Sequence, residues 1–148
     1  MSKYYSGKFR PKNISKYKGD WREIRYRSHW ERQVFRWCDT NNNVVSWNSE
    51  EVVIPYICKT DGKPHRYFVD LAITFSDGKK HLVEIKPKSQ TLEPKKRRQT
   101  KKYINEVMTY AKNISKWNAA EEWCKDNGWT FSIWTEDTIK GLGIKLLT

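Results

Sequence analysis

The sequence contains few of the residues that build disulfide frameworks or zinc sites. Its 148 residues include three histidines and three cysteines, Cys38, Cys58 and Cys124, which form no CxxC pair. The histidines show no zinc-ligand spacing, and an odd number of widely separated cysteines argues against a disulfide scaffold. We therefore expect three buried free thiols in a protein of a reducing compartment.

Long hydrophobic runs are also absent. The first residues, MSKYYSGKFRPKN, contain no apolar segment typical of a secretion signal, and no stretch is long enough to span a bilayer. These absences predict an intracellular protein that is soluble when synthesised and has no membrane partner. The composition, 37% hydrophobic and 14% aromatic, argues against disorder, and the length suits one domain with its own core.

Acidic residues are scarce relative to basic ones. The chain has 17 Asp and Glu against 29 Lys and Arg, a net charge of +12. The positive charge is concentrated in residues 1–30 and 95–102, and such clustering favours an anionic partner, most often nucleic acid. The alternative is a basic surface that serves solubility alone, which rarely requires clustered charge.

Hydrophobic periodicity predicts a mixed α/β order along the chain. Residues 28–39 are expected to form a helix with Ser28 as its N-cap. Four strands follow, over residues 44–47, 51–57, 66–75 and 80–86, with hairpin turns at Asp61-Gly62 and Asp77-Gly78. The pattern then predicts helices over 101–113 and 117–128, the second ending at Gly128, a buried strand over 129–134 and a short helix or turn from Thr135.

The N-terminal residues lack a clear period. We interpret residues 1–26 as a basic arm that either packs on the domain or lies over a ligand, and residues 27–148 as a single domain. No internal repeat is present.

Two carboxylates and a lysine occupy neighbouring predicted strands. Because side chains alternate along a strand, Glu84 and Lys86 share one face. A two-residue turn at Asp77-Gly78 would put Asp70 on the other face, whereas a three-residue turn with Gly78 in a left-handed conformation pairs Asp70 with Glu84 or Lys86. We expect the three-residue turn because it also aligns the apolar residues of both strands.

Carboxylates on paired strands lie about 5 Å apart and repel each other unless a cation lies between them. Oxygen ligands suit Mg²⁺, for which Mn²⁺ can substitute. A metal held by Asp70 and Glu84, with Lys86 beside the attacking water or the phosphate, would suit hydrolysis of a phosphodiester bond. The alternative is an ordinary water-facing strand, on which charged residues are common, and this pattern alone leaves both interpretations open.

The spacing of Asp70 and Glu84-Ile85-Lys86 resembles the PD-(D/E)XK nuclease superfamily, which includes restriction enzymes, resolvases and TnsA-type transposon endonucleases. The resemblance implies a mixed central β-sheet flanked by helices, with a restriction-endonuclease-like α-β-β-β-α-β core. It also implies a divalent metal bound by Asp70, Glu84 and the Ile85 carbonyl, with Lys86 as a catalytic residue. Val69 stands where the superfamily motif has proline.

The segment YRSHWERQVFRWCD carries a second match. Many superfamily members have an acidic residue on the first helix that completes the metal site, and Glu31 is the candidate here. The competing interpretation is a capping box, in which Glu31 reaches back to the amide of Ser28. FSIWTEDTI resembles the terminal strand of TnsA-type nucleases and is expected to have a structural role.

Over its full length the chain resembles the head completion nucleases of T-even-type tailed phages, through segments such as SEEVVIPY, HRYFVDL and KKYINEVMTYAKNISKW. The resemblance implies an endonuclease acting on double-stranded DNA after packaging and before tail attachment. Implied partners are capsid portal or neck proteins, and implied locations are the host cytoplasm during assembly and the virion. The alternatives are a non-catalytic DNA-binding protein that plugs the portal, and a junction resolvase or transposase-type endonuclease.

Basic residues just beyond the catalytic strand are expected to contact the DNA backbone. They are Lys88, Lys95, Lys96, Arg97, Arg98, Lys101 and Lys102. The alternative is a solvated loop.

Overall fold

The structure, a computed structural model, describes residues 6–146; residues 1–5 and 147–148 lie outside the described range. At its centre is a four-stranded sheet with the strand order β3, β6, β7, β8. These strands are β3 (Val44–Asn48), β6 (Leu71–Phe75), β7 (Lys80–Ile85) and β8 (Thr130–Trp134). The first three pair antiparallel and β8 pairs parallel to β7, so the sheet is mixed, as predicted.

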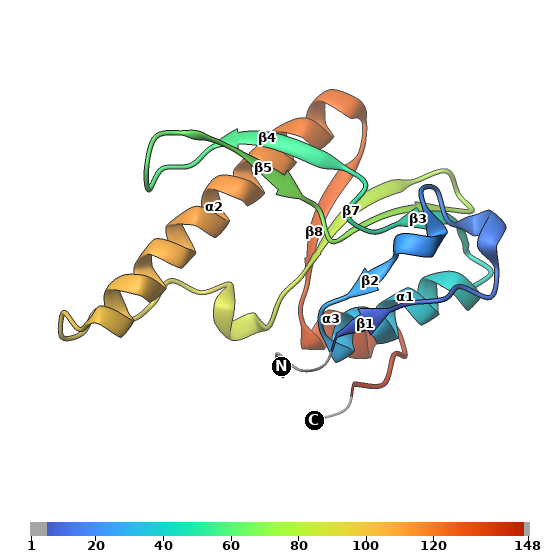
Figure 1. Ribbon diagram of the computed structural model, residues 1–148, viewed down its shortest axis with the longest axis horizontal. Coiled ribbons are helices and arrows are strands. Elements are labelled where there is room, and N and C mark those ends of the chain that lie inside the picture. The colour runs from blue at the N-terminus through green and yellow to red at the C-terminus, as the bar shows by residue number, and fades with distance from the viewer. Residues whose placement is uncertain (1–5, 147–148) are drawn as a thin grey trace.

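Helices cover both faces of this sheet. α1 (His29–Thr40) lies on one face and α2 (Lys101–Asn127) on the other, while α3 (Glu136–Gly141) follows β8 beside α1 (Figure 1). This arrangement confirms the expected mixed α/β fold with a restriction-endonuclease-like core.

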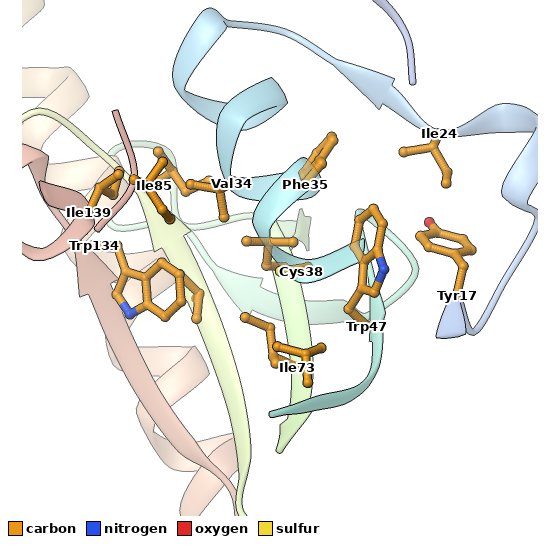
Figure 2. Packing of buried hydrophobic residues seen from close by; sticks show 14 residues of the cluster. Tyr17, Ile24, Val34, Phe35, Cys38, Trp47, Ile73, Ile85, Trp134 and Ile139 are labelled. Carbon is orange, nitrogen blue, oxygen red and sulfur yellow. The ribbon is translucent and has the colours of Figure 1, made fainter. Parts of the chain in front are cut away.

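Alternating side chains divide the sheet between two hydrophobic clusters. Figure 2 shows Phe35 and Cys38 of α1 near Trp47 and Ile73 of the sheet. The cluster on the opposite face includes Ala72, Leu82, Trp117, Ala120 and Cys124. All three cysteines are buried and free, as predicted.

The helix predicted over residues 28–39 is confirmed within one residue as α1. Ser28 is its N-cap, and the Ser28 hydroxyl oxygen accepts the N–H of Glu31 at 3.2 Å. The two helices predicted after residue 100 are wrong, because α2 runs without interruption. Residues 114–116 contain neither Gly nor Pro, and the Ser115 hydroxyl donates to the Ala111 carbonyl within the helix. α2 ends at Gly128 (φ 72°), as predicted.

The single strand predicted over residues 66–75 is also wrong. Its first part belongs to β5 (Pro64–Phe68), which pairs with β4 (Val53–Ile57) in a separate hairpin on α2. The chain leaves this hairpin at Val69, whose N–H donates to the Val52 carbonyl at 3.0 Å. Asp70 therefore stands between two sheets, immediately before β6.

The N-terminal segment packs on the domain in its described part. It contains short strands β1 (Gly7–Lys8) and β2 (Arg25–Tyr26), and Tyr17 and Ile24 are buried in the core. Asp39, buried near the end of α1, accepts the backbone N–H groups of Lys12 and Asn13 at 2.8 and 3.0 Å. The boundary at residue 26 stays a prediction.

Within residues 6–146, no helix combines the length and the apolar character that crossing a membrane requires.

The turn between β6 and β7 sets the register of the sheet. Phe75 N–H donates to the Lys79 carbonyl at 2.9 Å around a three-residue loop, and Gly78 has φ 86°. Leu71 then lies opposite Val83, and the same register continues to place Asp70 opposite Glu84. The predicted three-residue turn and its register are confirmed.

We expect Gly78→Ala to destabilise the protein by about 1 kcal/mol, because an L side chain disfavours this left-handed backbone conformation. No heavy atom lies within 4 Å of the added Cβ, so the cost is conformational rather than steric. Urea unfolding measures it, with Gly141→Ala in α3 as the control, since that Cβ also meets open space and the backbone there is not left-handed. Equal effects of the two substitutions would contradict the assignment.

Candidate active site

Asp70 and Glu84 meet where β6 begins and β7 ends. The Asp70 Oδ2 atom accepts the backbone N–H of Ile85 at 2.8 Å, which fixes the carboxyl group across the strand pair. The strand register places its side chain on the same face as Glu84, whose charge raises the pKa of Asp70. The predicted convergence of these two carboxyls is therefore present in the structure.

Glu84 is buried, with 7% of its surface exposed, and two aromatic side chains hold it. The Tyr67 hydroxyl donates to Glu84 Oε1 at 2.7 Å, and the Trp117 indole N–H points to the same oxygen at 3.4 Å. These donors come from β5 and α2, so two separate elements orient one carboxylate. Both of these hydrogen bonds engage Oε1; none between residues 6 and 146 engages Oε2.

Like charge and burial dominate the electrostatics of the site. Burial raises the pKa of Asp70 well above its usual range, and the neighbouring carboxylates Glu84 and Glu31 raise it further. The N–H of Ile85 acts in the opposite direction but does not offset them. Two carboxyls in this position require either a shared proton or a cation.

Lys86 follows Glu84 by two residues and emerges on the same side of the strand. Its backbone N–H donates to the Trp134 carbonyl at 3.1 Å, which continues the pairing with β8, and its side chain is half-buried. A second lysine, Lys116 of α2, lies near it, with its Nζ 5.6 Å from the Tyr67 ring centre. Burial lowers the pKa of Lys116, Lys86 lowers it further, and Glu84 opposes both.

Glu31 lies in the first turn of α1 and has the capping role. Its Oε1 accepts the backbone N–H of Arg27 at 3.3 Å, and its Oε2 lies 3.5 Å from the Ser28 hydroxyl. The capping box predicted that Glu31 would accept the backbone N–H of Ser28, whereas it accepts the N–H of Arg27, one residue earlier. Burial, together with the charges of Glu50 and Glu84, raises the pKa of Glu31 to about 7. Glu31 therefore caps α1 and also contributes charge to the candidate site.

The donor set at Asp70 and Glu84 fits a hard divalent cation. It consists of carboxylate oxygens that repel each other without a counter-charge, and Mg²⁺ binds through one or two carboxylates while keeping several waters. Glu31 does not form a compact three-ligand group with Asp70 and Glu84, since among residues 6–146 such a group occurs only elsewhere. The ligand roles of Glu31 and of the Ile85 carbonyl stay predictions.

That compact group is Cys58, Asp61 and His65, in the β4–β5 hairpin. The Cys-x₂-Asp-x₃-His spacing is not a standard zinc signature, so the sequence did not indicate this group. Its sulfur and nitrogen donors would suit zinc rather than magnesium. Each donor has a partner: Cys58 Sγ lies 3.0 Å from the Thr60 hydroxyl, and Asp61 accepts from His65 and from the Lys63 N–H. We therefore assign the group to the turn.

Lys88 lies beside α3, where its backbone N–H donates to Glu136 Oε1 at 2.8 Å. The other six predicted DNA-binding residues lie at or just before the start of α2, whose first half projects beyond the sheet (Figure 1). Residues 89–97 and this half-helix enclose a groove of about 1060 Å³, whose lining includes Lys95, Arg97, Lys101 and Lys102. Lys96 and Arg98 are exposed beside it. Contact with DNA stays a prediction for all of these residues.

Two of the seven residues predicted to bind DNA are paired with acidic side chains. Arg97 pairs with Glu106 at 2.9 Å, and Lys88 lies 3.7 Å from Asp137. The other five are in no ion pair between described residues. The free charge is therefore concentrated between residues 95 and 102.

Sequence analysis missed Tyr67, Trp117 and Lys116. Trp117 and Lys116 lie in or beside a predicted helix with no sign of a neighbouring carboxylate, and nothing in a single strand marks Tyr67 as a partner of Glu84. Only their distance in space from Glu84 reveals them.

Comparison with known proteins agrees with this geometry. The family described as TnsA-like endonuclease N terminal matches residues 41–136, more than half of the chain. The head completion nuclease of Enterobacteria phage T4 is 44% identical over 146 residues, which cover 95% of this chain and 97% of that protein. No solved structure is significantly similar. The family match includes Asp70, Glu84 and Lys86 but begins after Glu31.

In the metal-free protein, Glu31 should lower the stability of the fold as pH rises. Its pKa is about 7 in the folded state, against about 4.3 in an unfolded chain. Between these values the folded state holds a proton that the unfolded state has released, so the free energy of unfolding falls, on the order of 2 kcal/mol by pH 8. Urea unfolding in EDTA at pH 5 and pH 8 measures this fall.

Glu31→Gln should show a smaller fall between the two pH values than the wild type, because glutamine does not ionise. Glu121→Gln, an exposed position on α2, is the control and should match the wild type. An identical fall in Glu31→Gln and the wild type would contradict the assignment.

Proposed function

The chain belongs to the TnsA-like endonuclease family, of PD-(D/E)XK type, and from this membership we propose that it is a Mg²⁺-dependent DNA endonuclease of phage head completion. The observation that best supports the chemistry is the convergence of Asp70 and Glu84 where β6 begins and β7 ends, with Lys86 two residues after Glu84 along the chain. The name of the phage T4 relative, a head completion nuclease, supports the biological setting.

The finer setting that we propose follows from the family resemblance described under the sequence analysis. The protein acts on double-stranded DNA, in the host cytoplasm during assembly and then in the virion, next to the capsid portal or neck proteins. It acts after DNA packaging and before tail attachment.

The residues divide the chemistry of phosphodiester hydrolysis between them. Asp70 and Glu84, with the Ile85 carbonyl and Glu31, would hold the metal, which would act as a Lewis acid and lower the pKa of a bound water. Lys86 donates a hydrogen bond to the attacking water or to a phosphate oxygen and stabilises the negative charge that develops there. Tyr67 and Trp117 keep Glu84 in one orientation, as partners of metal ligands commonly do.

Cleavage assays on linear, circular and branched DNA, each in Mg²⁺, Mn²⁺ and EDTA, test this function. The wild type should cut with either metal and not in EDTA, and Asp70→Ala and Lys86→Ala should each lose about 10²-fold or more of the rate. Both variants should still bind DNA.

Asp126→Ala and Lys79→Ala are the matched controls, because both side chains are exposed. They should cut at the wild-type rate. DNA binding without cleavage of any substrate, unchanged by the substitutions at Asp70 and Lys86, would refute the enzyme and favour a DNA-binding capsid component.

The basic groove generates a separate prediction. Lys101 and Lys102 stand in the first turn of α2, where positive charge opposes the helix dipole, so replacing them should not destabilise the helix. Lys101→Gln with Lys102→Gln should weaken duplex binding and lower the slope of log affinity against log salt by about 1 for each lost phosphate contact.

Fluorescence anisotropy across a salt series in EDTA measures both quantities. Lys125→Gln, at the far end of the same helix, is the control and should keep the wild-type slope. If the double variant also keeps that slope, the groove is not the path of the DNA.

A further inference from the structure

Glu50 has an unusual backbone for its residue type. It lies in the connection between β3 and β4 with φ 57°, and within residues 6–146 it is the only non-glycine residue with a positive φ. This left-handed conformation is disfavoured for an L side chain, and residues held in it cluster at active sites and ligand clamps. The Glu50 N–H donates to the Val69 carbonyl at 3.0 Å, so Glu50 is bound to the residue immediately before Asp70.

The side chain of Glu50 holds an arginine in a fixed plane. Arg27 Nε lies 2.9 Å from Glu50 Oε1, and Arg27 Nη2 lies 3.1 Å from Oε2, a two-point pairing. An exposed ion pair contributes little stability, whereas the left-handed backbone has a cost, so stability alone does not account for Glu50 at this position.

The fixed guanidinium lies beside the candidate active site. The Arg27 backbone N–H donates to Glu31 Oε1, and the charges of Glu50, Glu31 and Asp70 all raise the pKa of Arg27. The pairing with Glu50 occupies two of the five N–H donors of a guanidinium. The Arg27 side chain is 59% exposed, so the other donors can meet a ligand from solvent.

We propose that Arg27 binds a phosphate of the DNA substrate at this site and that Glu50 is the positioning residue that orients its guanidinium. The proposal rests on the nuclease function proposed above. Guanidinium binds phosphate through paired N–H groups, so a fixed plane improves the contact. This positioning role also explains why a glutamate, rather than a glycine, occupies the left-handed position at residue 50.

The first test measures duplex DNA binding in EDTA, where no cleavage occurs. Arg27→Gln should weaken binding several-fold and lower the salt slope by about 1, the effect of losing one phosphate contact. Arg36→Gln removes the same charge from an exposed position on α1 and should keep the wild-type affinity within about twofold. An unchanged affinity in Arg27→Gln, or an equal loss in Arg36→Gln, would overturn the phosphate contact.

The second test separates positioning from folding. Glu50→Gly removes the strained side chain, so the variant should unfold at the same or higher urea concentration than the wild type. It should also bind duplex DNA as tightly or more tightly, because a negative charge is lost, yet cut about 10-fold more slowly, since Arg27 is no longer oriented. Glu50→Gln should bind and cut duplex DNA as Glu50→Gly does.

Wild-type cleavage by Glu50→Gly would overturn the positioning role. Arg27→Lys should recover duplex binding but not cleavage, because an ammonium lacks the planar pair of donors; full recovery of cleavage would also overturn it. Absence of cleavage by the wild type itself would refute the proposed nuclease, while the binding of Arg27→Gln in EDTA still decides the phosphate contact.

Discussion

The backbone pairing of β6 with β7 places Leu71 opposite Val83, and the candidate site depends on this register. It is set by a three-residue turn in which Gly78 adopts a left-handed conformation. A slip by one residue would turn Asp70 away from Glu84 and move the apolar side chains of one strand from one hydrophobic cluster to the other, where they do not fit. Hydrophobic burial therefore enforces the same register that brings two repelling carboxyls together, and the core supplies the stability that their repulsion removes.

The site is held by donors that prevent the carboxyls from moving apart. Ile85 N–H fixes Asp70, while Tyr67 and Trp117 fix Glu84 from two other elements. With such supports the raised pKa of Asp70 is a property of the fold rather than of a chance side-chain position. A group of this kind releases protons when a cation enters, so metal binding, pH and stability are linked.

The continuous helix α2 connects the candidate active site with the basic groove. Its middle carries Lys116 and Trp117 beside the site, and its first half borders the basic groove and projects past the sheet (Figure 1). Because one continuous helix spans both regions, the distance from the groove to the candidate site does not depend on a loop. Two separate helices, as periodicity suggested, would have left that distance variable.

The sequence by itself determined the features that depend on near neighbours: the Ser28 cap of α1, the Gly78 turn, and the shared face of Glu84 and Lys86. Strand alternation and turn chemistry are local, so one chain segment contains the information. Tertiary structure alone decided the break before β6, the union of the two predicted helices, and the contacts of Glu84 with Tyr67 and Trp117. Those features depend on packing between segments distant in sequence, which the period of a single segment does not record.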